Sequence, residues 1–171
     1  MLVRSRRVRY CVSGIAALAA AVALAAVSAH AQRGDGGPFA GFAGNWSGSG
    51  TITVSNGTSE RIRCRAKYAI NDGGTGLQQD LRCASDSYKF EVTSNVNSTG
   101  GSGIQGSWTE VTRNASGNVL GNASGGRIDA TVAGVGFSAG LTVSTSGNSQ
   151  SVTIRPVGTD VTLVSITMRR S

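Results

Sequence analysis

Residues 61–83 read RIRCRAKYAINDGGTGLQQDLRC, two runs of alternating apolar and polar residues separated by a glycine-rich turn. Successive side chains of a β-strand point to opposite faces, so each run predicts a strand with one face in a core. An antiparallel hairpin closed by Ile70 and Leu77 keeps the two apolar faces together. The same register places Cys64 opposite Cys83. This segment therefore predicts a β-hairpin whose register is set by its apolar face and its two cysteines.

The same alternation continues through the rest of the chain from residue 44 onward. Turn residues recur every 8–12 residues or so, roughly the spacing of β-sandwiches and barrels. The predicted strands cover residues 46–54, 61–70, 77–83, 88–93, 104–112, 119–123, 127–132, 137–145, 151–156 and 161–168. Each has one polar face, and no stretch has helical periodicity. We therefore predict an all-β fold, a single antiparallel meander barrel of about ten short strands.

The first predicted turn contains Asn56-Gly57, a pair typical of two-residue hairpins. A two-residue loop would place Ile52 opposite Arg61 on the core face. An odd-length loop keeps even-numbered residues together instead. We therefore expect Gly57 in the left-handed region, as a bulge that follows the turn.

The first 31 residues have the three parts of a secretory signal peptide. Four arginines precede an apolar, alanine-rich stretch at 12–27, and Ala29 and Ala31 bracket a cleavage site. The apolar stretch is short against the roughly 20 residues of a membrane span, so we expect cleavage rather than anchoring. The predicted organisation is a helical, cleaved signal peptide at 1–31, a flexible lead-in at 32–43 and a β-barrel domain at 44–171.

Removing this segment changes the charge of the chain. The four lost arginines leave 12 of the 16 Lys and Arg against 9 Asp and Glu, so the net charge falls from +7 to +3. The strongly basic balance that would favour nucleic acid is thereby lost, and no nucleic-acid partner is expected. Cys64 and Cys83 remain, and in an exported protein they are expected to form a disulfide, the alternative being two buried thiols. The expected location is periplasmic or secreted.

The mature chain offers few groups for catalysis. Its lack of histidine removes the Ser-His-Asp triad, and its scattered carboxylates and paired cysteines do not make a zinc site. The glycine-rich turn at 72–76 lacks the residues of a phosphate loop and has too few carboxylates for calcium. We therefore predict no catalytic residue, no metal and no cofactor. Glu110 shares the parity of Ile104 and Trp108, so it is expected to point inward, either paired at a rim or as an acid.

Two groups of residues are candidates for binding. Aromatic side chains on core-facing positions could line a cavity for a small apolar ligand, namely Tyr68, Phe90, Trp108 and Phe137. A row of cations on the outer face could bind an anionic envelope component, namely Arg61, Arg63, Arg65, Lys67 and Arg82. The alternative for this row is a solvated face that discourages edge-to-edge pairing.

Gly44-Asn45-Trp46 at the first predicted strand resembles the Gly-x-Trp opening of lipocalins and related calycin barrels. A wider series of motifs resembles a group of uncharacterised small exported proteins of alphaproteobacteria over about residues 42–170. The motifs are Arg63-Cys64-Arg65, Leu81-Arg82-Cys83-Ala84, Gly106-Ser107-Trp108-Thr109-Glu110 and Met168-Arg169-Arg170. The resemblance implies an envelope location and a barrel-like fold, and it brings no known activity.

These observations favour an exported, non-enzymatic β-barrel protein of the cell envelope that binds a small apolar ligand or an anionic surface. A structural or stress-related secreted protein without a ligand is one alternative. A carboxylate-dependent enzyme that works within the barrel is another. A hollow interior lined by aromatic side chains would favour binding, a cleft with two convergent carboxylates would favour catalysis, and a filled interior would favour a structural role.

We expect the exported protein to begin at Gln32, or within about two residues of it, because small residues bracket the bond before it. N-terminal sequencing of exported material checks this position. Exported protein that still begins at Met1 would contradict the prediction.

Overall fold

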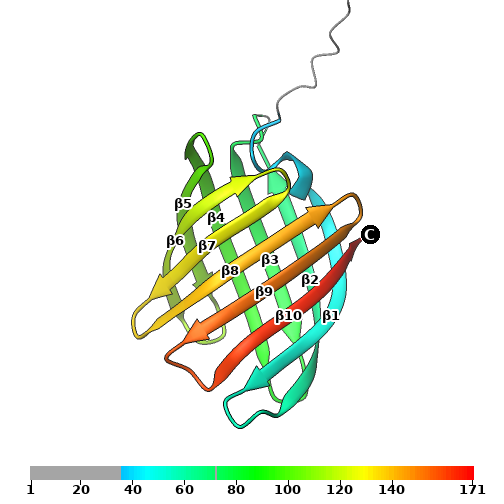
Figure 1. The fold of residues 1–171 in the computed structure, drawn as a ribbon, viewed down its shortest axis with the longest axis vertical. Helices are drawn as coiled ribbons and strands as arrows, with labels where there is room; N and C mark the ends of the chain where they lie inside the picture. The colour runs from blue at the N-terminus through cyan, green and yellow to red at the C-terminus, as the bar shows by residue number, and fades with distance from the viewer. Residues whose placement is uncertain (1–35, 72) are drawn as a thin grey trace, which may run out of the picture. The chain divides into compact units, whose positions relative to one another are not determined.

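The computed structural model describes residues 36–71 and 73–171, so the predicted signal peptide and the first residues of the lead-in lie outside it. Ten strands form one closed antiparallel barrel in which chain neighbours pair and β1 pairs with β10 (Figure 1). This confirms the predicted all-β meander barrel. The elements are η1 (Ala40–Phe42), β1 (Gly44–Val54), β2 (Ser59–Ile70), β3 (Gly76–Ala84), β4 (Lys89–Gly100), β5 (Gly103–Glu110), β6 (Ala115–Ser124), β7 (Arg127–Gly134), β8 (Phe137–Ser146), β9 (Ser149–Val157) and β10 (Val161–Arg170).

The β2–β3 hairpin has the predicted register. Ile70 lies opposite Leu77 and Cys64 opposite Cys83. The two cysteines form a disulfide inside the barrel with their Cα atoms 4.1 Å apart, as the sequence predicts. By the chain-entropy argument, closing a loop of about 20 residues stabilises the fold by roughly 3 kcal/mol.

The β1–β2 hairpin also follows the predicted parity. Ile52 lies opposite Glu60, so even-numbered residues of both strands share the inner face. Gly57 has a φ of +84°, in the left-handed region, and the Val54 amide donates to the Thr58 carbonyl across the turn at 3.0 Å. A β-bulge at Gly57 therefore replaces the two-residue turn.

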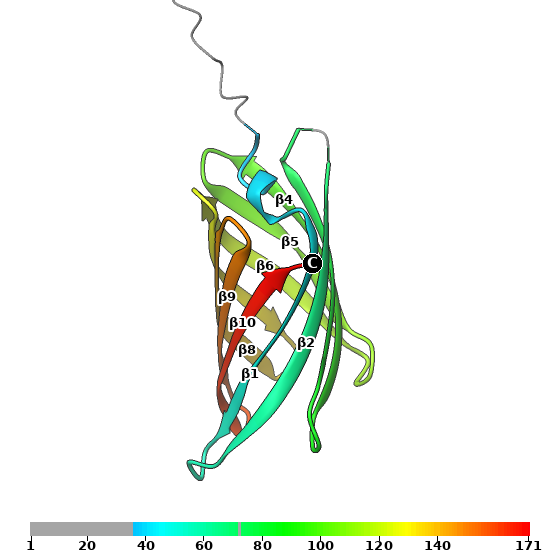
Figure 2. The ribbon, with the colours of Figure 1, turned by 90° about the vertical axis from the view of Figure 1, so that its right-hand side faces the viewer.

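The segment before β1 packs across one end of the barrel, as Figure 2 shows for η1. Phe39 and Phe42 are fully buried, and the Trp46 indole N–H donates to the Phe42 carbonyl at 2.9 Å. The Phe39 amide donates to the Gly74 carbonyl of the β2–β3 turn at 3.1 Å. Residues 36–43, which the sequence assigned to a flexible lead-in, thus plug this end. We call it the closed end and the opposite one the open end.

The meander distributes its hairpins between these two ends. The β2–β3, β4–β5, β6–β7 and β8–β9 turns lie at the closed end. The β1–β2, β3–β4, β5–β6, β7–β8 and β9–β10 turns lie at the open end. Within the described ranges, no helix is long and apolar enough to cross a membrane.

Inward-facing glycines allow the strands to approach closely where the barrel closes. An ideal Cβ on Gly50 would lie 1.8 Å from the Ser165 carbonyl oxygen and 2.7 Å from the Ile166 Cα. Both atoms belong to the β10 backbone, which cannot move without breaking the pairing of β1 with β10. Glycine at this position is therefore a requirement of closure.

Replacing Gly50 with alanine should destabilise the barrel by about 2 kcal/mol or more, because the new methyl group overlaps backbone. Gly140→Ala is the matched control, since its Cβ would meet no atom within 4 Å. That change should leave stability within about 1 kcal/mol of wild type. Urea unfolding of the two variants measures both effects, and equal midpoints would contradict the role assigned to Gly50.

Candidate functional site

The burial of inward-facing side chains changes along the barrel axis. At the closed end they are buried on every strand, for example Trp46, Leu77, Ile104, Val143 and Met168. Other apolar residues pack on this core but stay partly exposed. Except for Ile70, they lie in the open half: Val54, Leu81, Tyr88, Phe90, Trp108, Val132, Leu141, Ile154 and Val161. Burial in this half is uneven, because Ile52, Ile62 and Ala139 are each only 1% exposed.

Trp108 and Phe137 meet inside the open half although they stand three strands apart. Trp108 lies opposite Gly117, Gly117 opposite Gly134, and Gly134 opposite Phe137. The two intervening glycines present no side chain, so the rings approach to 5.7 Å between centroids in an edge-to-face arrangement. The Trp108 indole N–H donates to the Ala133 carbonyl at 3.3 Å. The result is an aromatic pair laid over a bare stretch of sheet.

The other two candidate aromatics lie apart from this pair. Phe90 is also at the open end, where it stacks on Tyr88 with 6.1 Å between centroids. Tyr68 belongs to the closed end, 5% exposed, with its hydroxyl donating to Gln150 Oε1 at 3.2 Å. Burial raises the pKa of Tyr68, so the phenol is neutral. The structure thus brings three of the four candidates to one end and leaves Tyr68 in the plugged core.

Neutral polar groups line the interior beside the aromatic pair. Ser94 lies opposite Trp108 on one side and Gln79 on the other. The Ser94 hydroxyl donates to Gln79 Oε1 at 2.8 Å. The Ser94 hydroxyl oxygen can accept a further hydrogen bond, whereas Gln79 lies opposite Tyr68 of the closed end and hydrogen-bonds to its hydroxyl. A hydroxyl or amide on a ligand in the open half could bond to Ser94.

The charges at the open end are engaged in local contacts. In the described part of the open half, no strand directs a Lys or Arg side chain inward. Arg113, on the β5–β6 loop, lies 4.9 Å over the Phe90 ring and donates to the Lys89 carbonyl at 3.0 Å. Glu60 on the inner edge of β2 accepts from the Ser87 amide at 2.8 Å. No cation inside the open half is available to a carboxylate ligand.

Glu110 points inward, as its parity predicts, and it is 6% exposed. Its Oε1 accepts from the Glu91 amide at 3.0 Å and from the Thr112 hydroxyl at 2.6 Å, and its Oε2 accepts from the Arg113 amide at 2.7 Å. Burial alone would raise the pKa of Glu110, but these hydrogen bonds outweigh it and hold the pKa below its usual range. The ionised carboxylate caps the β5–β6 turn and carries no proton at neutral pH for acid catalysis.

A pocket of about 420 Å³ opens beside these groups, between the β1–β2 and β3–β4 hairpins. Its lining residues are Ile52, Val54, Thr58, Ser59, Glu60, Asp86, Ser87 and Tyr88. Among the residues that the structure describes, no three His, Cys, Asp or Glu side chains are grouped to hold a metal ion. The open end thus combines a half-buried apolar interior with a mainly polar pocket on one side.

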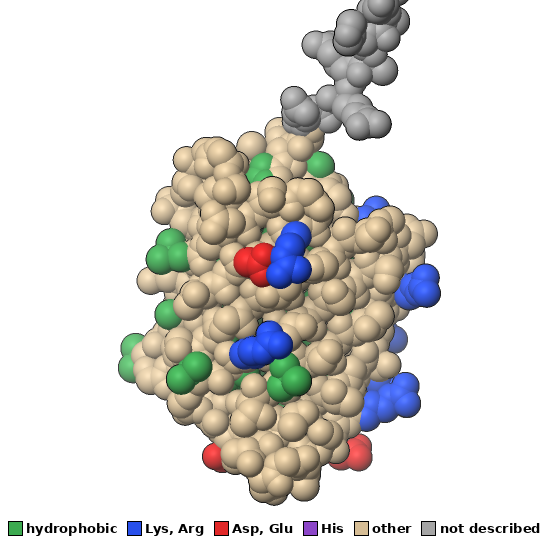
Figure 3. Space-filling model, viewed as in Figure 1, with side chains coloured by type: hydrophobic (Ala, Val, Ile, Leu, Met, Phe, Trp, Pro, Cys, Tyr) green, Lys and Arg blue, Asp and Glu red, His purple; other side chains and the backbone are tan. Residues whose placement is uncertain are grey.

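The predicted basic residues lie exposed on the outer wall. Figure 3 shows Lys and Arg side chains along the right-hand edge, where Figure 1 places β1 and β2. Arg65 lies opposite Arg82 on one side and Ser47 on the other. Barrel closure places Arg169 opposite Ser47, so the basic face continues onto β10, which the strand pattern alone could not show. The described ion pairs are Lys89–Glu91, Glu110–Arg113 and Arg127–Asp129, none of which involves this face.

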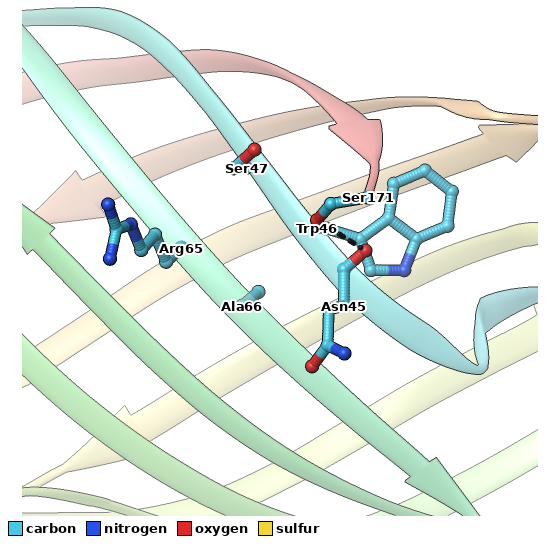
Figure 4. Close-up of a pocket in the computed structure, with 6 residues that line it drawn as sticks. All are labelled: Asn45, Trp46, Ser47, Arg65, Ala66 and Ser171. Atoms are coloured by element: carbon cyan, nitrogen blue, oxygen red, sulfur yellow. Dashed lines mark hydrogen bonds between the residues drawn. The ribbon is translucent and has the colours of Figure 1, made fainter.

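A shallow groove of about 390 Å³ lies on the basic face, bordered by β1, β2 and the last residue. In Figure 4 the Arg65 side chain extends away from the Trp46 indole, consistent with one facing out and the other in. The Ser171 hydroxyl donates to the Asn45 carbonyl at 3.3 Å. The groove therefore presents Arg65 with the polar side chains of Asn45 and Ser47 beside it.

Replacing Glu110 with glutamine should destabilise the protein by about 2 kcal/mol at pH 7, since charge-assisted hydrogen bonds to the turn are weakened. Because the pKa of Glu110 is lowered on folding, its contribution is present above the unfolded value of about 4.3 and is lost as pH falls through the folded one. Unfolding in urea from pH 7 to pH 3 should show the two proteins converging in acid. The exposed Asp80→Asn is the control, and equal stability at pH 7 would contradict the capping role.

Two solved structures are among those that the barrel resembles. One is Rv2717c from M. tuberculosis, with 11% sequence identity, a TM-score of 0.56, and coverage of 77% of this chain and 94% of that one. The other is the S-type phycobiliprotein lyase CPES from Guillardia theta, with 8% identity, a TM-score of 0.54, and coverage of 78% and 90%. No protein-family model and no curated protein matches the sequence. Both neighbours are calycin-like β-barrels, and at these identities the likeness shows a shared fold and nothing finer.

Proposed function

We propose that the protein is an exported, non-enzymatic barrel of the cell envelope that binds a small, uncharged apolar ligand through its open end. One observation carries this proposal: the partly exposed apolar side chains inside the barrel gather in the open half, while η1 plugs the other end. Exposed apolar surface inside a concave site is what a small apolar ligand covers on binding. A barrel with only a structural role would gain stability by filling that half as well.

The charges around the interior favour an uncharged ligand. A fatty-acid carboxylate would enter beside Glu60 and Glu110 and would find no free cation among the described inner residues. Leaving a buried carboxylate without a partner is strongly unfavourable. The Ser94 hydroxyl instead suits a hydroxyl or amide group. The ligand class supported best is an apolar chain or ring with a neutral polar group.

Export is supported by the sequence of the N-terminus and by the disulfide, which is typical of oxidising compartments. The resemblance to small exported alphaproteobacterial proteins would place the molecule in the periplasm. One fold neighbour is by name a lyase, so this architecture also serves an enzyme. Here the only buried carboxylate among the described residues caps a turn, which favours binding over carboxylate catalysis.

The basic face supports a second candidate function, attachment to an anionic envelope component. Arg63, Arg65 and Arg82 stand on the exposed wall, and none is in a described ion pair. Barrel closure adds Arg169 to the same surface. Binding through this face would weaken as salt rises, because exposed charges are screened. That dependence distinguishes it from ligand binding in the apolar interior.

The uncharged fluorophore N-phenyl-1-naphthylamine tests the proposed ligand class with mature protein in solution. Its emission should rise on binding, and dodecanol should displace it at about a tenfold lower concentration than dodecanoate at pH 7. Phe137→Ser, at the open rim, should weaken probe binding. Leu120→Ser is the matched control, since Leu120 is 60% exposed on the outer wall. No emission change with folded wild-type protein, or equal displacement by the two competitors, would overturn the proposal.

A further inference from the structure

Three hairpins at the open end each carry an exposed valine, either on the loop or at the end of a strand. Val111 on the β5–β6 loop is 58% exposed, Val135 on the β7–β8 loop 104%, and Val157 at the end of β9 66%. We call these residues the valine rim. Their hairpins follow one another around the barrel, so their tips stand about 10 Å apart. Figure 3 shows separate apolar side chains protruding on the left and lower left, the side of these hairpins in Figure 1.

The fold itself does not require these valines. Val135 precedes Gly136, whose φ of +69° makes the turn tight, and the turn places no demand for an apolar residue at position 135. With its side chain fully exposed, Val135 packs against nothing. The turns of the closed end, within the described residues, contain only small or polar residues at 73–75, 101–102, 125–126 and 147–148. Exposed valine is thus confined to turns at one end.

The rim adjoins the candidate ligand site. Val135 is two residues from Phe137, and Val157 is three residues from the half-buried Ile154. Arg113 and the exposed Arg155 lie on the same side of the opening as the valines. The two remaining hairpins of this end are polar and carry Asn56 and Asp86. The opening therefore has one side with the exposed valines, two arginines and the exposed Asp160 of the β9–β10 turn, and a polar side with Asp86.

We propose that the valine rim docks the open end onto a lipid surface, with the three side chains inserted at the interface and Arg155 near lipid phosphates. Three separate tips suit a fluid surface that conforms to each of them. A folded partner would instead need a continuous complementary patch, usually with aromatic anchors. The polar hairpins then stay in water. If the proposed ligand binding holds, docking lets the ligand move between lipid and barrel without crossing water.

Sedimentation with neutral phosphatidylcholine vesicles tests the docking. Mature wild-type protein should partition to these vesicles, with little change on adding salt. The triple change Val111→Ser, Val135→Ser and Val157→Ser should lower partitioning by about tenfold or more, as apolar burial is lost at three sites. Leu120→Ser, an exposed apolar position on the outer wall, should partition like wild type. Val135→Ser alone should give a smaller loss, and circular dichroism confirms that each variant is folded.

Three outcomes would overturn the docking proposal. The first is a triple variant that partitions like wild type. The second is wild-type binding that occurs only on anionic vesicles and disappears in salt, as the basic face predicts. The third is a wild-type dimer in solution that the triple change separates, which would make the rim an interface between copies.

Ligand binding is measured separately, with the soluble fluorophore. The triple variant should bind it in solution as tightly as wild type but take it up more slowly from preloaded vesicles. Wild-type protein that partitions to neutral vesicles but binds no fluorophore would remove the proposed ligand function and support the docking alone. Equal rates of fluorophore uptake from vesicles by the wild type and the triple variant would overturn the proposal that docking speeds ligand transfer.

Discussion

The pairing of β1 with β10 is the contact on which the rest of the structure depends. It turns a meander with two open edges into a barrel with one interior. It requires glycine at position 50, where any side chain would meet the β10 backbone. It also brings Arg170 over the Trp46 ring at 4.6 Å and lets its guanidinium donate to the Gly41 carbonyl at 2.8 Å. The pairing of β1 with β10 therefore also holds residues 36–43 in place at the closed end, and it adds Arg169 to the basic face.

Closure also makes the two ends unequal. An even number of strands returns the chain to the end where β1 began, so η1 and the end of β10 meet there and close it. The opposite end receives hairpins only, with no segment to cover it. Most of the half-buried inner apolar side chains lie there, and its hairpins are the ones that carry exposed valines. The candidate ligand site and the valine rim both follow from this asymmetry.

Much of the fold could be predicted because alternation reveals which face of a strand is buried. That rule, with two cysteines, gave the β2–β3 register residue by residue, and it placed Glu110 inside. Alternation does not reveal height along the barrel, since height depends on how strands stagger on closure. Tyr68 and Trp108 therefore looked equivalent but lie in the closed and open halves. The sequence did not predict the plug, because Phe39 and Phe42 stand in a glycine-rich segment with no periodic pattern. It also did not predict that Glu110 caps the β5–β6 turn, because most of its partners there are backbone amides.

The bare sheet beneath Trp108 links closure to function. Gly117 lies opposite Gly134, and a Cβ on Gly117 would approach the Ala133 carbonyl oxygen to 1.7 Å, so this position cannot be filled from within. A Cβ on Gly134 would come within 3.1 Å of the Trp108 ring. Glycine at these two positions allows the strands to approach closely but leaves no side chain to cover the neighbouring aromatic pair, which remains partly exposed. An apolar ligand in the open half would supply the missing contacts, which ties binding to the same constraint that closes the barrel.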